Sequence, residues 1–238
     1  MRRYRLLIAG EGEHELGAKP RSCRGDDWAL DASDLPALPR LVQRLLADPC
    51  DVDLFARKLV KKFPHIQKNL KGVAPGKLSG HAKKLFWTLR AVARKHDAAA
   101  YLIDRDGPKN AGTLAALREG RSAFEEVHGT FPCAVGAAVE TFDAWMICDR
   151  DAIGAAGGDP AKANEKPELL QGGPRCRKHP KRIAGGIFRT RRGSGLGPKY
   201  KVVAQQVNLA LLKKLCPKGF KPFAKEVRER IGPVVSGG

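Results

Sequence analysis

The sequence contains no apolar run near the roughly 20 residues that cross a bilayer, and its Met-Arg-Arg opening leads directly into a strand-like segment. We therefore expect a cytoplasmic protein with no signal peptide and no membrane partner. The six cysteines form no Cys-X-X-Cys pair and no Cys/His spacing of the kind that holds zinc. Reduced thiols are the expectation for all of them.

Acidic residues are few, and over one long interval they are absent. The chain has 25 Asp and Glu against 44 Lys and Arg, a formal net charge of +19, with no acid between Glu168 and Glu226. This excess predicts a polyanionic partner. Nucleic acid fits better than an anionic membrane, because no basic helix has a face of Trp, Phe and Leu. We assign the nucleic-acid contacts to Arg175, Arg177, Lys178, Lys181, Arg182, Arg189, Arg191, Arg192, Lys199 and Lys201.

Length and apolar content suit one α/β domain. Of the 238 residues, 42% are hydrophobic, which is enough for a buried core. Apolar runs of strand length alternate with segments of helical periodicity, which predicts a mainly parallel central sheet covered by helices. We expect strands over residues 4–9, 98–104 and 133–139, and helices over residues 38–46, 79–95, 111–127, 200–215 and 223–231.

The chain divides into two parts within this domain. Residues 1–153 are expected to form the α/β domain, with a helical insertion at about residues 34–77. Residues 154–238 are expected to form a basic, loop-rich segment and C-terminal helices that pack on the same domain. Residues 18–33 lack periodicity and predict a loop. Residues 50–63 fit either an alternating edge strand or a helix, and both interpretations stay open.

The strand expected over residues 98–104 ends in Asp104-Arg105-Asp106-Gly107. Alternate residues of a strand share a face, so Asp104 and Asp106 would point the same way and repel each other unless a proton or a cation intervenes. Carboxylate oxygens at a strand end suit Mg²⁺. The competing interpretation is a solvated turn, since Asp-Gly is ordinary turn chemistry.

Two other expected strands also end in acids. The first is followed by Gly10-Glu11-Gly12-Glu13-His14-Glu15, where the glycines allow close approach of the backbone. The third is followed by Glu140 and Asp143, which would lie one turn apart on a shared helix face. Because ligands of open α/β sheets bind at the carboxyl ends of the strands, we expect these carboxylates to converge there.

Together, the run from Gly10 to Glu15 and the run Tyr101-Leu102-Ile103-Asp104-Arg105-Asp106-Gly107 resemble the Toprim superfamily. That fold, shared by topoisomerases, bacterial primases and OLD-type nucleases, carries a glutamate after its first strand and Asp-X-Asp after a later one. The segments Val139-Glu140-Thr141-Phe142-Asp143-Ala144-Trp145 and Cys216-Pro217-Lys218-Gly219-Phe220-Lys221-Pro222-Phe223 are similar to a stand-alone Toprim-like family. Members of that family often occur beside ABC- or OLD-type ATPases in bacterial defence loci.

The resemblance implies a Mg²⁺- or Mn²⁺-dependent nuclease on DNA or RNA, with an ATPase as a possible partner. It implies that Glu11, Asp104 and Asp106 are the catalytic residues: Glu11 ligates the metal or shuttles a proton, and Asp104 and Asp106 hold the metal. It makes Glu15, Glu140 and Asp143 candidates for a second metal or its water shell. The sequence departs from the similar family at His14, where threonine is frequent. Whether His14 orders the turn or contacts metal stays open.

A non-catalytic protein that binds nucleic acid or an ATPase is the alternative from another class. The acids expected at the strand ends argue against this alternative, because a protein that only binds a polyanion gains no affinity from carboxylates that face it. A topoisomerase would need a nucleophilic tyrosine on a separate domain, for which the chain is too short. The sequence contains no His-Glu-X-X-His motif, so it does not indicate a zinc protease. The sequence is also compatible with a homo-oligomer.

Overall fold

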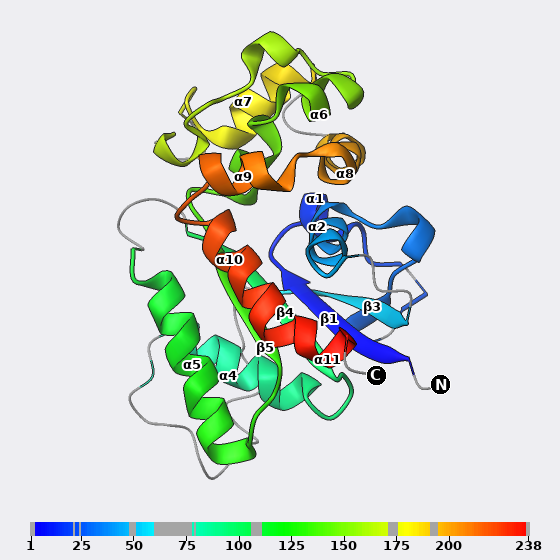
Figure 1. Ribbon diagram of the computed structural model, residues 1–238, viewed down its shortest axis with the longest axis vertical. Coiled ribbons are helices and arrows are strands. Elements are labelled where there is room, and N and C mark those ends of the chain that lie inside the picture. Colours follow the sequence, from blue (N-terminus) through cyan, green and yellow to red (C-terminus); the bar gives the residue numbers. More distant parts are fainter. Residues whose placement is uncertain are drawn as a thin grey trace.

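The computed structural model describes residues 3–20, 22–23, 25–47, 51–59, 78, 80–105, 111–170, 176–190 and 195–236. Within these residues a five-stranded sheet has the order β2-β3-β1-β4-β5 (Figure 1). β2 runs antiparallel to β3, and the other neighbouring pairs are parallel. The prediction of a mainly parallel α/β sheet is confirmed. The strands are β1 (Tyr4–Gly10), β2 (Asp27–Ala29), β3 (Val52–Lys58), β4 (Ala98–Asp104) and β5 (Cys133–Ala138).

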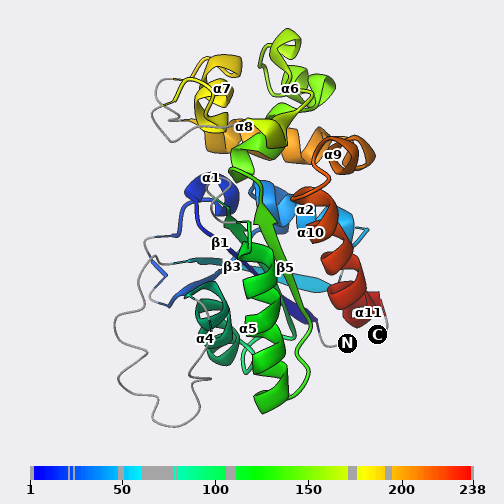
Figure 2. The ribbon, with the colours of Figure 1, turned by 90° about the vertical axis from the view of Figure 1, so that its left-hand side faces the viewer.

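The sheet separates two hydrophobic layers, because alternate residues of each strand point to opposite faces. In β1, Leu6 and Ile8 enter one layer, whereas Leu7 and Ala9 enter the other. The first layer is covered by α2 (Ala37–Leu45), α10 (Phe220–Glu226), a π-helical turn (Val227–Ile231) and α11 (Gly232–Ser236). The second layer is covered by α4 (Gly80–Val92) and α5 (Thr113–His128) (Figure 2).

Helices α4 and α5 pack closely at Gly120. A Cβ atom there would lie 2.2 Å from the carbonyl oxygen of Ala82, so any side chain would force the two backbones apart. The close approach buries Leu85, Phe86 and Phe124 between the helices and the sheet. We therefore expect a glycine to be required at position 120 for packing rather than for function.

A helical lobe stands over the carboxyl-terminal edge of the sheet (Figures 1 and 2). Helix α8 (Leu196–Gln206) packs against α1 (Glu13–Leu16) and α2, and this contact joins the lobe to the sheet. Within the segment expected to be basic and loop-rich from residue 154 on, the described residues include several short helices before α9 (Leu209–Leu215). The helices there are short, so they present too few turns for a periodic pattern. The lobe contains η3 (Phe142–Ile147), α6 (Arg150–Ala155), η4 (Pro160–Lys162), η5 (Pro167–Leu169), α7 (Pro180–Ile187), α8 (Leu196–Gln206) and α9 (Leu209–Leu215).

Two expectations for the first half of the chain need correction. Residues 50–63 contain β3, an interior strand between β2 and β1, so the proposed helical insertion over residues 34–77 is interrupted by part of the sheet. In the described part of residues 34–77, the helical elements are α2 and the end of the 3₁₀ turn η1 (Ala32–Asp34). Residues 60–77 lie outside the described residues. Residues 18–33 include β2, which is only three residues long and therefore shows no alternation.

The expected helix over residues 200–215 is two helices. The Asn208 side chain accepts hydrogen bonds from the backbone N–H groups of Ala210 at 2.9 Å and Leu211 at 3.1 Å, so it caps α9 and separates it from α8. After α9, the chain turns into α10, whose Phe220 and Phe223 rings lie 5.2 and 6.0 Å from the ring of Trp145. The tail therefore packs directly against the segment that follows β5.

None of the helices in the described part of the chain combines the length and hydropathy that a bilayer crossing requires. The cysteines that lie in this part, Cys23, Cys133, Cys148, Cys176 and Cys216, are all free thiols.

Candidate carboxylate site

The site lies where the connections of the sheet change direction. From β1 the chain crosses to β3 on one side, whereas β4 pairs with the other side of β1 and leads on to β5. The adjacent carboxyl ends of β1 and β4 therefore form the switch point at which open α/β sheets bind ligands. Glu11 follows β1 directly, and Asp104 is the last residue of β4. The prediction that these two strand ends are neighbours is confirmed.

The turn after β1 folds the Glu15 carboxylate back over the strand end. Its Oε2 atom accepts a hydrogen bond from the Glu11 backbone N–H at 3.2 Å, and the residue is only 6% exposed. A Cβ atom at Gly10 would lie 2.7 Å from the same oxygen, and one at Gly12 would lie 3.0 Å from Oε1. Both glycines leave room for this buried carboxylate, which is the physical reason for the Gly-Glu-Gly pattern.

Asp104 and Asp143 are each fixed by one hydrogen bond from the lobe. The Phe142 backbone N–H donates to Oδ1 of Asp104 at 2.7 Å, which ties the end of β4 to the segment after β5. Asp143, in η3, accepts a hydrogen bond from the Tyr200 hydroxyl of α8. Both carboxylates therefore have defined positions at the carboxyl edge of the sheet.

The electrostatics show that four carboxylates belong to one cluster. Burial raises the pKa of Glu15 to about 8, and the charges of Asp143 and Glu11 add to the rise, while backbone hydrogen bonds oppose it. Burial likewise raises the pKa of Asp104 well above its usual value, with repulsion from Glu15, Asp143 and Glu11 acting in the same direction. We call Glu11, Glu15, Asp104 and Asp143 the carboxylate cluster.

The chemistry of this cluster fits a hard divalent cation, because carboxylate oxygens are the ligands that Mg²⁺ and Mn²⁺ prefer. A cation would also relieve the repulsion that raises the two pKa values. Among the described residues, however, no group of three or more His, Cys, Asp or Glu side chains is placed so that it could hold a metal ion. Asp106 and Gly107 lie outside the described residues.

The expectation that Glu140 and Asp143 share a helix face is wrong. Glu140 follows β5 with a φ of +65°, a left-handed conformation that turns the chain out of the sheet before η3 begins at Phe142. Glu140 is buried. The two acids therefore occupy different kinds of backbone, and Asp143 is among the charges that raise the pKa values of Glu15 and Asp104.

Sequence patterns contain no signal for Tyr200, although this residue of α8 belongs to the site. Its ring is fully buried, 6.2 Å from the His14 ring, and its hydroxyl holds Asp143. Burial and the Asp143 charge raise its pKa well above the ordinary value, so the hydroxyl stays a donor. The two partners in this bond are 57 residues apart, so the interaction cannot be predicted from local sequence.

His14 lies beside the cluster, half-buried on α1. Burial and the positive charge of Lys181 lower its pKa, against the opposing charges of Asp143 and Glu13. The neutral imidazole is therefore favoured near neutral pH. The His14 ring also makes an edge-on contact with the ring of Tyr200, which joins α1 to α8.

The basic residues assigned to nucleic acid fall into two groups. Lys199 donates to the carbonyl of Ala156 at 2.9 Å, and Lys201 forms an ion pair with Asp34, so both support packing of the lobe. The exposed members, which follow residue 176 and surround α7, are Arg177, Lys178, Lys181, Arg182 and Arg189. Arg175, Arg191 and Arg192 lie outside the described residues.

Comparisons of the chain with protein-family models, with curated proteins and with solved structures found no significant match. Function must therefore be inferred from the geometry and chemistry of the carboxylate cluster and of the exposed basic residues around α7.

Proposed function

We propose that the protein is a Mg²⁺- or Mn²⁺-dependent nuclease that cleaves phosphodiester bonds in DNA or RNA. The observation that carries the proposal is the carboxylate cluster at the switch point of a parallel sheet. Burying Glu15 and Asp104 among other acids costs free energy, as their raised pKa values indicate. Strain of this kind is more often maintained at functional sites than in surface turns.

In this proposal Glu11 and Asp104, together with Asp106 by the Toprim resemblance, hold the divalent cation. When bound, the cation would neutralise charge on the phosphodiester and activate water for attack. Tyr200 holds Asp143 in position through its hydroxyl, and the Phe142 N–H holds Asp104. Glu15, with a pKa raised to about 8, is the group that would release or take up a proton when the cation binds or leaves.

The polyanionic substrate would be held by the exposed basic residues around α7. Lys181 of α7 is close enough to His14 to lower the imidazole pKa, so the basic surface reaches the edge of the carboxylate cluster. Positive charge beside an acidic site lets a phosphate backbone approach carboxylates that would otherwise repel it. An ATPase partner remains part of the proposal only through the resemblance of the sequence motifs.

A non-catalytic nucleic-acid-binding protein is the second candidate. It is favoured by one observation, namely that no group of three His, Cys, Asp or Glu side chains in the described part of the chain could hold a metal ion. A cleavage assay separates the two. Purified protein is incubated with plasmid, single-stranded DNA and total RNA, with Mg²⁺, Mn²⁺ or EDTA. The nuclease proposal predicts metal-dependent cleavage of at least one substrate, whereas binding without cleavage of any substrate supports the second candidate.

We expect the exposed basic residues to carry the salt-sensitive part of nucleic-acid binding. Replacing Arg177, Lys178 and Lys181 together by alanine should weaken binding and flatten the dependence of log K on log salt, by up to about 0.9 for each duplex phosphate that is no longer neutralised. The measurement is fluorescence anisotropy with a labelled duplex over a range of salt concentrations.

The matched control removes three positive charges elsewhere, at the exposed residues Lys95, Lys225 and Arg228. It lowers the net charge equally but leaves α7 intact, so its salt slope should stay near that of the wild type. Equal slopes for the two triple variants would show that only net charge matters and would remove α7 from the interface.

A further inference from the structure

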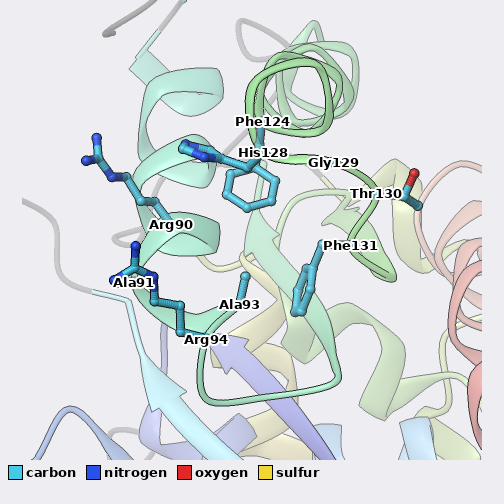
Figure 3. A pocket seen from close by; sticks show the side chains of 9 residues that line it. All are labelled: Arg90, Ala91, Ala93, Arg94, Phe124, His128, Gly129, Thr130 and Phe131. Atoms are coloured by element: carbon cyan, nitrogen blue, oxygen red, sulfur yellow. The ribbon is translucent and has the colours of Figure 1, made fainter. Parts of the chain in front are cut away.

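A second candidate site lies at the opposite edge of the sheet from the carboxylate cluster. Helix α4 leads into the start of β4, and α5 leads into the start of β5, so the carboxyl ends of both helices meet at the amino-terminal edge of the sheet. Between them is a pocket of about 720 Å³ (Figure 3). This volume lies within the range of small-molecule sites, about 300–1,000 Å³.

One wall of the pocket is cationic. Arg90 lies in the last turn of α4 and Arg94 follows the end of that helix, and both line this side of the pocket (Figure 3). The Arg90 guanidinium lies 5.3 Å from the ring of Trp87, a cation–π contact that limits its freedom. No acidic residue lines the pocket, and neither arginine forms an ion pair with any described residue.

The other wall is aromatic. The rings of Phe124 and Phe131 lie 6.4 Å apart, and the His128 ring lies 4.9 Å from Phe124 (Figure 3). Both phenylalanines are buried, whereas His128 is exposed and extends the aromatic surface to the mouth of the pocket. A flat ring can pack on such a surface, and the imidazole nitrogens and the nearby Thr130 offer hydrogen bonds.

A simpler explanation exists for the cations alone. Basic side chains near the carboxyl end of a helix interact favourably with its dipole, which would suit Arg90 and His128. That effect requires neither a pocket nor an aromatic wall facing the two arginines. It also does not explain why two arginines line one pocket that has no acidic residue in its lining. Guanidinium groups are well suited to bind phosphate.

We propose that this pocket binds a nucleoside monophosphate, with the phosphate between Arg90 and Arg94 and the base against His128 and Phe131. The ligand is either a free mononucleotide or the 5′-terminal nucleotide of a strand, because both present the same phosphate and ring. The site shares no residue with the carboxylate cluster, so its test does not depend on nuclease activity.

Isothermal titration in EDTA tests the proposal, with adenosine 5′-monophosphate, adenosine and inorganic phosphate as probes. Wild type should bind the monophosphate at least about tenfold more tightly than either fragment. The double substitution R90A/R94A should weaken that binding by about tenfold or more. The matched control K83A/K95A removes two lysines of the same helix region and should change affinity less than about twofold. H128A, at an exposed position, provides a second variant if R90A/R94A does not fold.

Short single strands with and without a 5′ phosphate distinguish the two sources. If only the 5′-phosphorylated strand binds, and R90A/R94A removes that preference, the ligand is a strand end. If adenosine 5′-monophosphate and the strands all fail to bind through Arg90 and Arg94, or if K83A/K95A weakens binding equally, the proposal is wrong. D104N should bind the monophosphate as wild type does, so the result does not depend on the function of the carboxylate cluster.

Discussion

The substitution Asp104→Asn should reduce nucleic-acid cleavage by about 100-fold or more while leaving nucleic-acid binding intact. Asparagine keeps the volume of the side chain and still offers an oxygen to the Phe142 N–H, which donates to Asp104 at 2.7 Å. It removes the negative charge that would ligate a divalent cation, and loss of one charge-stabilising group typically costs this much rate. Cleavage is measured at saturating Mg²⁺, and binding by anisotropy in EDTA.

The matched control for this variant is Asp151→Asn. Asp151 is an exposed acid in the first turn of α6, so its replacement makes the same chemical change outside the carboxylate cluster. Cleavage by D151N should stay within about twofold of wild type. If D104N cleaves as fast as D151N, Asp104 only terminates a strand and the nuclease proposal loses its central residue.

The second large effect concerns stability. Glu15 has a pKa raised to about 8 in the folded protein, against an ordinary value of 4.5. Between these values the folded state holds a proton that the unfolded state has released, so the free energy of unfolding should fall as pH rises from about 4.5 to 8. The slope can reach about 1.4 kcal/mol per pH unit, giving a total on the order of a few kcal/mol.

Glu15→Gln should reduce this pH dependence, leaving the part that comes from the raised pKa of Asp104, and should melt higher than wild type at pH 8 in EDTA. Glutamine retains the acceptor for the Glu11 N–H but cannot ionise. Mg²⁺ should stabilise wild type more than the variant, because a ligand that binds the native state stabilises it by mass action. The measurement is the free energy of unfolding by urea between pH 4.5 and 8.5.

Glu13→Gln is the control for the stability prediction. Glu13 is exposed on the same helix and pairs with Lys58 at 3.2 Å, a surface contact worth at most about 1 kcal/mol. Its substitution should leave the pH slope of unfolding as in wild type. An unchanged, wild-type slope in E15Q would contradict the prediction, because it would mean that Glu15 does not titrate between pH 4.5 and 8.

Local patterns in the sequence were sufficient to predict the strands that form the site. Apolar runs ending in acids placed Glu11 and Asp104 correctly at the ends of β1 and β4, because strand periodicity and strand termination are properties of a few neighbouring residues. The convergence of those ends followed from the rule that parallel strands share one carboxyl edge. These elements depend on no contact between distant segments.

The remaining features depend on contacts between distant segments. The Tyr200 hydroxyl meets Asp143 only when the lobe lies over the sheet, and β2 pairs with β3, where Asp27 also forms an ion pair with Arg57, 30 residues away. The turn at Glu140 adopts a left-handed conformation that nothing in its neighbours demands. Short helices such as α7, with two glycines in eight residues, have too weak a local preference to predict.

Direct titration with Mn²⁺ tests most directly the claim that the carboxylate cluster holds a divalent cation. Free Mn²⁺ is measured by electron paramagnetic resonance as protein is added, for wild type, D104N and D151N, without nucleic acid. Stoichiometric binding by wild type and D151N, weakened at least about tenfold in D104N and competed by Mg²⁺, is the result that we predict. Absence of stoichiometric binding by wild type, or equal binding by D104N, would contradict the metal-dependent mechanism.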